Sequence, residues 1–90
     1  MTTGKPIAVL LVDDHAVVRE GLKMVLARDP QIKVVGQAGT ADAAITETKR
    51  LKPDVILMDI RLPGTDGVQA CSDILEQWPQ IRVLFLTSFA

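Results

Sequence analysis

The composition indicates one small domain and gives no sign that it binds a strongly charged partner. Of the 90 residues, 48% are apolar, and the formal net charge at pH 7 is -1, values typical of a single globular domain. The ten lysines and arginines are scattered along the chain. A basic surface for nucleic acid or for a membrane is therefore not expected in this stretch.

Apolar run lengths and the cysteine content predict a cytoplasmic protein. No apolar run approaches the roughly 20 residues that span a bilayer, and the first residues lack the charged and then apolar pattern of a signal peptide. Cys71 is the single cysteine, which excludes an internal disulfide or a zinc site built from cysteines. This agrees with a reducing compartment, and we expect neither membrane contact nor secretion.

Strand-like and helix-like patterns alternate in the first half of the chain. The apolar run 7–12 predicts a buried strand, and helical spacing of apolar residues predicts a helix over about residues 16–28. The run 33–38 is short and more polar, and its interior glycine is tolerated best in an edge strand. Thr40 then predicts the N-cap of a second helix, which reaches Leu51 and stops before a proline.

The second half repeats the alternation. Residues 55–58 form another apolar run, and residues 61–67 are rich in turn formers. Asp66 is a candidate cap for a third helix, and residues 81–86 predict a fourth strand. We expect the apolar face of the third helix to carry Val68, Cys71, Ile74, Leu75 and Trp78. Four continuous apolar strands joined by helices predict an α/β fold with an open, doubly wound parallel sheet.

Three carboxylates follow two of these strands. Asp13 and Asp14 come directly after the first strand, and Asp59 ends the third. Neighbouring strands lie about 4.8 Å apart, and ligands of open α/β sheets sit at the carboxyl ends of the strands. Three acids so close repel one another unless a cation lies among them, and Mg²⁺ prefers oxygen ligands. The pattern predicts a divalent metal site.

Two residues at this strand end, Asp14 and His15, also have an interpretation that involves no metal. Asp14 could instead cap the helix that follows, since acids at a strand end often serve only as caps. His15 is expected to be a solvated residue of the first helical turn and not a ligand, because a magnesium site prefers oxygen.

Three ordered segments carry a resemblance to a known family. Leu11-Val12-Asp13-Asp14-His15, residues 55–67 and residues 83–88 resemble, in order and spacing, the receiver domain of bacterial two-component response regulators. Residues 12–15, 18–22 and 34–36 are most similar to the NarL/FixJ branch, whose members usually carry a C-terminal helix-turn-helix domain that binds DNA. The resemblance covers essentially the whole chain and implies a flavodoxin-like sheet with strand order 2-1-3-4.

The resemblance implies a role for each site residue. Asp59 would be the phosphoryl acceptor, phosphorylated by a sensor histidine kinase. Asp14 would bind Mg²⁺ directly, Asp13 mainly through water, and Arg61 through its backbone carbonyl. Thr87 would hydrogen-bond the phosphoryl group, and Ser88 would leave room for it. Such a module controls transcription through its output domain and is not an enzyme, although it assists its own phosphorylation and dephosphorylation.

The chain departs from the family at its C-terminus. Receivers continue through another helix, a fifth strand that ends in a lysine, and a final helix, so residues 1–90 are expected to be one incomplete receiver domain, truncated before the fifth strand. We expect a bare edge at residues 81–86 and an uncovered face beside residues 18–26. Self-association or homodimerisation through that edge, and slow phosphorylation, would follow.

Two alternatives to an active receiver follow from the sequence. A truncated, phosphorylation-impaired receiver could act only as a protein interaction or dimerisation module, and DNA would then be reached only through a domain outside the chain. A flavin-binding domain or an aspartate-based phosphohydrolase is disfavoured, because the chain has no glycine-rich phosphate loop and no Asp-x-Asp pattern after the first strand.

Overall fold

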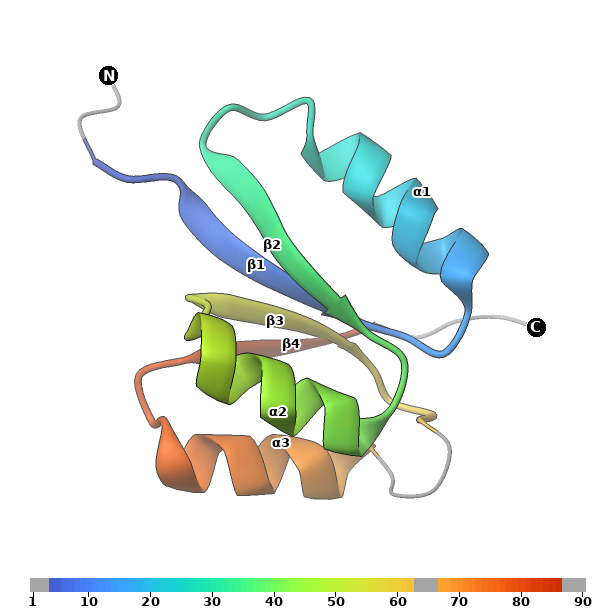
Figure 1. Ribbon diagram of the computed structural model, residues 1–90, viewed down its shortest axis with the longest axis vertical. Helices are drawn as coiled ribbons and strands as arrows, with labels where there is room; N and C mark the ends of the chain where they lie inside the picture. Colours follow the sequence, from blue (N-terminus) through green and yellow to red (C-terminus); the bar gives the residue numbers. More distant parts are fainter. Residues whose placement is uncertain (1–3, 63–66, 87–90) are drawn as a thin grey trace.

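The computed structural model describes residues 4–62 and 67–86, which form one open sheet flanked by helices (Figure 1). The strands lie in the order β2-β1-β3-β4, and every pairing is parallel. The expected doubly wound, flavodoxin-like arrangement is therefore confirmed, as is the edge position of the second strand. In chain order the elements are β1 (Ile7–Val12), α1 (Ala16–Leu26), β2 (Ile32–Ala38), α2 (Ala41–Leu51), β3 (Val55–Asp59), α3 (Gly67–Gln77) and β4 (Arg82–Leu86).

Helices cover both faces of the sheet, with α1 on one side and α2 and α3 together on the other (Figure 1). Leu10 and Leu11 are successive residues of β1 and therefore point to opposite faces, yet both are completely buried. Burial on both faces explains why β1 reads as a continuous apolar run and not as an alternating one. Among the described residues, no helix is long and apolar enough to cross a bilayer.

Local hydrogen bonds set the ends of the first two helices. Helix α1 ends at Leu26, earlier than expected, because the N–H groups that follow the C-cap Ala27 bond only three residues back, from Arg28 to Val25 and from Asp29 to Leu26. Helix α2 begins as predicted, with Thr40 as its N-cap. It ends at Leu51 and is followed by the C-cap Lys52, which has a left-handed φ of 48° and donates its N–H to the Thr48 carbonyl.

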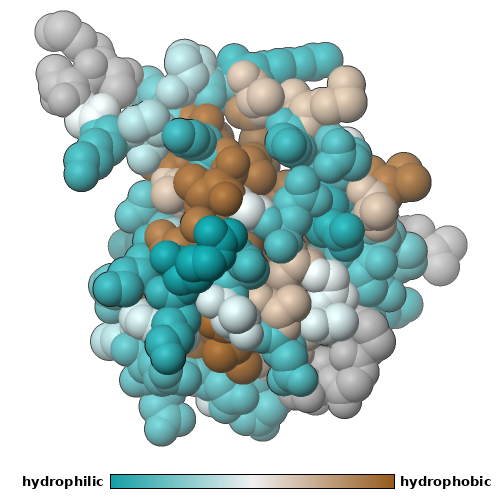
Figure 2. Space-filling model, viewed as in Figure 1, coloured by the Kyte–Doolittle hydropathy of each residue, from teal (hydrophilic) through white to brown (hydrophobic). Residues whose placement is uncertain are grey.

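Helix α1 covers its face of the sheet only loosely. None of its residues is buried, and Met24 and Val25 are 72% and 59% exposed. Figure 2 shows apolar side chains at the surface in the upper half of the view, where α1 and β2 lie. Residues 18–26 are thus largely uncovered in the structure, as expected.

The buried face of α3 agrees with the predicted one at Ile74, which is in the core, and at Trp78, which packs against it, but differs at the start of the helix. Gly67, Ala70 and Ile74 are buried, whereas Val68, which was expected to face the core, is 57% exposed. A Cβ atom on Gly67 would lie 2.7 Å from the Asp59 carbonyl oxygen, so the first turn of α3 approaches the sheet more closely than any larger residue permits. The predicted cap Asp66 lies outside the described residues.

The cap at Thr40 generates a stability prediction. Its Oγ1 accepts a hydrogen bond of 3.1 Å from the N–H of Ala43, and the Thr40→Ala variant should lose about 1 kcal/mol of unfolding free energy. Chemical denaturation measures the loss. The matched control is Thr46→Ala, an exposed position inside the same helix, which should change stability by less than about 0.5 kcal/mol. Equal effects of the two substitutions would contradict the cap.

A pair of glycines tests the close approach of α3 to the sheet. We expect Gly67→Ala to destabilise the fold by about 1–3 kcal/mol, since the added methyl must displace backbone. Nothing lies within 4 Å of a Cβ built on Gly21 in α1, so Gly21→Ala should stabilise by about 0.5–1 kcal/mol. Thermal unfolding of both variants measures the contrast, and stabilisation by both would show that the approach at Gly67 is wrong.

Candidate metal centre

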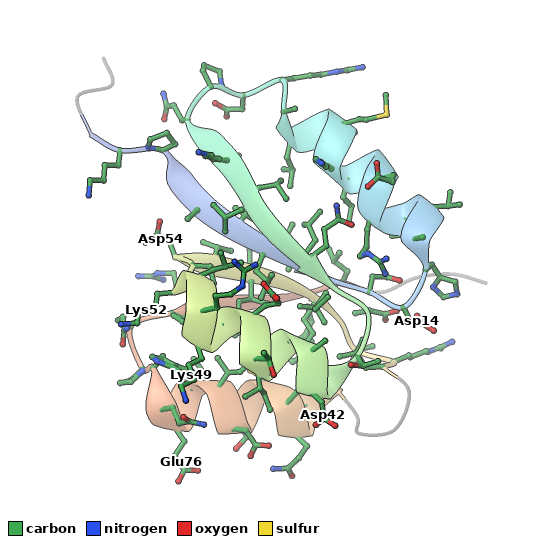
Figure 3. All side chains as sticks on the ribbon, viewed as in Figure 1. Asp14, Asp42, Lys49, Lys52, Asp54 and Glu76 are labelled. Atoms are coloured by element: carbon green, nitrogen blue, oxygen red, sulfur yellow. The ribbon has the colours of Figure 1, made fainter. Side chains whose placement is uncertain are left out.

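The sheet register brings the predicted acids together. Val12 of β1 pairs with Met58 of β3, so the next residue on each strand, Asp13 and Asp59, comes to the same position at the carboxyl edge. Asp13 still belongs to the sheet, because its N–H donates to the Ala38 carbonyl at 3.0 Å. Figure 3 shows the neighbouring Asp14 at this end of the sheet, away from Asp54 and Lys52 at the other.

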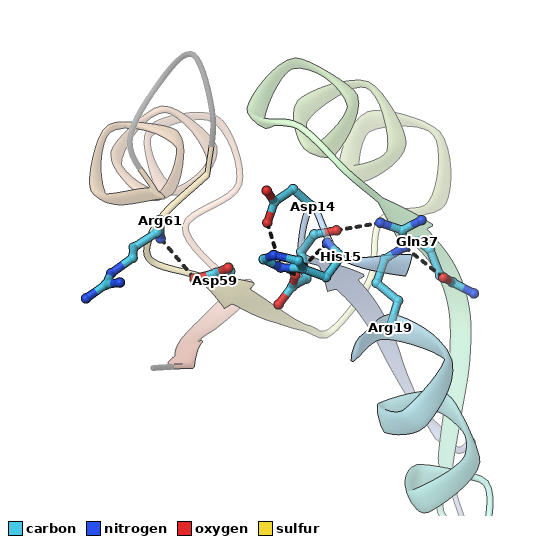
Figure 4. A network of polar contacts seen from close by, with 7 residues as sticks. Asp14, His15, Arg19, Gln37, Asp59 and Arg61 are labelled. Carbon is cyan, nitrogen blue, oxygen red and sulfur yellow. Dashed lines mark hydrogen bonds and ion pairs between the residues drawn. The ribbon is translucent and has the colours of Figure 1, made fainter. Parts of the chain in front are cut away.

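Four side chains form one cluster at this edge. One ligand atom from each of Asp13, Asp14, His15 and Asp59 lies within 4.8 Å of the others. Asp13 and Asp59 are 2% and 1% exposed, whereas Asp14 and His15 are exposed to solvent. The cluster thus has a buried floor of two carboxylates and an open side (Figure 4).

The two oxygens of Asp59 differ in their partners. Oδ1 accepts a hydrogen bond of 3.0 Å from the backbone N–H of Arg61. Oδ2 is buried, and no residue of the described part of the chain donates to it. A buried carboxylate oxygen without a partner is costly, so this atom suits a cation. Oxygen donors of this kind fit a hard divalent ion such as Mg²⁺.

His15 takes part in the cluster, which the sequence analysis did not foresee. Its ring Nδ1 lies 3.0 Å from Asp13 Oδ1 and 3.0 Å from Asp14 Oδ1, and its backbone N–H donates to the same Asp13 oxygen at 2.8 Å. His15 itself is the N-cap residue of α1. The alternative role of Asp14 as that cap is therefore wrong.

A second polar network supports the loop from behind. The Arg19 guanidinium donates through Nη1 to the Asp13 carbonyl at 2.5 Å and through Nε to Gln37 Oε1 at 3.0 Å (Figure 4). Sequence reasoning did not identify Arg19, because its partner Gln37 is 18 residues away and no local pattern joins them. They become neighbours because α1 lies against β2 in the fold.

Other predicted site residues are placed in part or not at all. Arg61 follows Asp59 closely and is exposed, and the ligand role of its backbone carbonyl stays a prediction. Thr87 and Ser88 lie outside the described residues.

The carboxylates around His15 generate a pH prediction. The hydrogen bond to Asp13, followed by the charge of Asp14, raises the pKa of His15 above its usual 6.5. Protonation therefore favours the folded state below pH 6.5, and this contribution is lost as the pH rises through the higher folded pKa. His15 is the single histidine, so an NMR titration without divalent ions reports it directly. The Asp14→Asn variant should lower this pKa, and an unchanged value would contradict the contact.

Comparison with known proteins agrees with this geometry. DevR/DosR of Mycobacterium tuberculosis, a DNA-binding transcriptional activator, is 45% identical over 83 residues, which are 92% of this chain and 38% of that protein. The response regulator protein VraR of Staphylococcus epidermidis is 47% identical over 92% of the chain and 40% of its own length. The chain thus spans about two fifths of these curated relatives.

Solved structures give the same picture. The signal receiver domain of NarL from Mycobacterium tuberculosis superimposes with a TM-score of 0.85 at 32% identity, over 97% of this chain and 70% of that one. A LuxR-family response regulator from Aurantimonas gives 0.89 at 34% identity, over 96% and 61%. Residues 9–90 match the response regulator receiver domain family, and the chain belongs to that family.

Proposed function

We propose that this chain is a phosphoryl-accepting receiver module of a two-component response regulator, with Asp59 as the acceptor and a sensor histidine kinase as the donor. The observation that carries the proposal is the buried Oδ2 of Asp59. It has no hydrogen-bond donor among the described residues and lies beside two further carboxylates. In a member of the receiver family, such an oxygen suits a bound cation, and the carboxylate to which it belongs can act as a nucleophile.

Mg²⁺ is the proposed cofactor. Asp14 and Asp59 would bind it directly, Asp13 mainly through water, and Arg61 through its backbone carbonyl. The three carboxylates satisfy the preference of Mg²⁺ for oxygen, and the open side at Asp14 leaves room for water ligands. When bound, Mg²⁺ neutralises negative charge as a phosphoryl group approaches the acceptor.

The chain's own residues would prepare the acceptor. The Arg61 N–H donates to Oδ1 and fixes the orientation of the Asp59 carboxylate, so that one carboxylate oxygen would stay with the cation while the other attacks phosphorus. A new O–P bond forms while the P–N bond of the kinase phosphohistidine breaks, and the leaving imidazole keeps the electron pair. Thr87 and Ser88 are the proposed contacts of the transferred group.

The wider role is inferred from the relatives. DevR/DosR is a DNA-binding transcriptional activator, and a solved relative, RcsB of Salmonella typhimurium, is described in its interaction with DNA. We infer that residues 1–90 form a single receiver domain within a cytoplasmic transcription regulator, and that DNA is bound by another domain of the whole protein. The module itself signals and is not an enzyme.

A second candidate function rests on β4. This strand is an edge of the described sheet, and its Leu84 and Phe85 are 55% and 40% exposed. Unpaired strand edges with apolar side chains recruit partners. The alternative is therefore an interaction or dimerisation module that pairs through this edge without being phosphorylated efficiently.

Mass spectrometry after incubation with acetyl phosphate and Mg²⁺ tests the proposal. We expect a mass increase of one phosphoryl group in the wild type and none in Asp59→Asn. The matched control is Asp42→Asn, an exposed acid of α2, which should still be modified. Removal of Mg²⁺ with a chelator should suppress the reaction.

Two outcomes would contradict the proposal. An adduct that persists in Asp59→Asn would show that the acceptor lies elsewhere. A folded wild type that self-associates and never forms the adduct would favour the interaction module.

A further inference from the structure

Arg19 connects three parts of the fold next to the metal centre. From α1, its guanidinium donates to the backbone carbonyl of Asp13 at the end of β1 and to the side-chain oxygen of Gln37 in β2. The side-chain Nε2 of Gln37 in turn donates to Glu20 Oε2 at 3.2 Å. One guanidinium therefore ties the first turns of α1 to the two strands beneath them (Figure 4).

The position of the β1–α1 loop depends strongly on this bridge. Helix α1 has no buried residue, so apolar packing fixes its place less firmly than it fixes α2. The loop between β1 and α1 supplies Asp13, Asp14 and His15, three of the four side chains in the cluster. Gly39 also leaves room for the Arg19 side chain, because a Cβ atom on Gly39 would lie only 3.4 Å from Arg19 Nη1.

Two effects of Arg19 on cation binding oppose each other. Its positive charge lies close to the carboxylates, and charge alone would weaken the binding of a divalent ion. Its hydrogen bonds hold the Asp13 backbone, and a fixed ligand loses less conformational entropy on binding. The Asp13 carbonyl receives the guanidinium directly at 2.5 Å, so we expect the second effect to exceed the first.

We infer that Arg19 is a positioning residue for the cation site, and that the Arg19–Gln37 bridge sets the affinity of Asp13 and Asp14 for a divalent ion. This inference rests on the proposed function, because it assumes that the carboxylates bind a cation. A guanidinium presents several N–H donors in a rigid fork, whereas the lysine ammonium is a compact point charge. Lysine at position 19 would keep the charge and lose the bridge.

Magnesium binding to the folded 90-residue chain, measured by calorimetry, tests the inference. We expect Arg19→Lys, Arg19→Met and Gln37→Met each to weaken Mg²⁺ binding about tenfold, which is typical for loss of a residue that orients a metal ligand. The control is Arg28→Met, which removes an exposed positive charge just after α1 and should leave the affinity unchanged. Broadening of the His15 ring signals by Mn²⁺ reports independently whether the ion still sits beside the loop.

The outcomes separate the two proposals. Equal affinity in the wild type and Arg19→Lys, or tighter binding in Arg19→Met, would overturn the positioning role and leave the cation site standing. A wild type that binds no Mg²⁺ would overturn the cation site itself. If an Arg19 variant does not fold, Gln37→Met decides, because it removes the Gln37 end of the bridge while the charge of Arg19 and its bond to the Asp13 carbonyl stay in place. Unchanged Mg²⁺ affinity in Gln37→Met would then overturn the role of the bridge.

Discussion

Repulsion between carboxylates is the constraint on which the carboxyl edge of this sheet depends. Asp13 and Asp59 are almost completely buried, and Asp14 lies in the same cluster. Two unit charges at this separation repel by roughly 3–4 kcal/mol at an effective dielectric constant of about 20. Several such repulsions are a large share of the 5–15 kcal/mol by which domains are typically stable. The edge therefore needs positive partners.

The described part of the chain supplies such partners only in part. Asp13 Oδ1 is satisfied by the backbone N–H and the ring of His15, and Asp59 Oδ1 by the backbone N–H of Arg61. Asp59 Oδ2 has no hydrogen-bond donor among the described residues. Arg19, the nearest cation in the network, is turned toward the Asp13 carbonyl and not toward the carboxylates. A divalent ion is the simplest partner that would satisfy all three acids together.

Much of the fold and the acidic cluster could be predicted from the sequence, because both depend on local signals. Continuous apolar runs mark strands covered on both faces, and acids at their ends must meet if the strands are parallel neighbours. The cap at Thr40 and the edge strand β2 were predictable for the same reason. At each of these positions, the local preference of the residue and its place in the fold favour the same structure.

Other features were not predictable, because they depend on contacts between distant segments. Val68 has the right spacing for the core, yet it is exposed because Gly67 brings α3 against the Asp59 backbone. His15 looked like a solvated residue, and its contact with Asp14 depends on how the loop turns. The Arg19–Gln37 bridge depends on the pairing of β2 with β1 and on the packing of α1 against β2.

Thermal unfolding as a function of Mg²⁺ concentration tests the central claim most directly. If a cation relieves the repulsion among Asp13, Asp14 and Asp59, Mg²⁺ should raise the unfolding temperature of the wild type. The gain should saturate at a few kcal/mol, about 2.7 kcal/mol when the ion is at 100 times its dissociation constant. Asp14→Ala should abolish the shift, while Asp42→Ala should keep it. Equal stabilisation of the wild type and Asp14→Ala by Mg²⁺ would contradict the account.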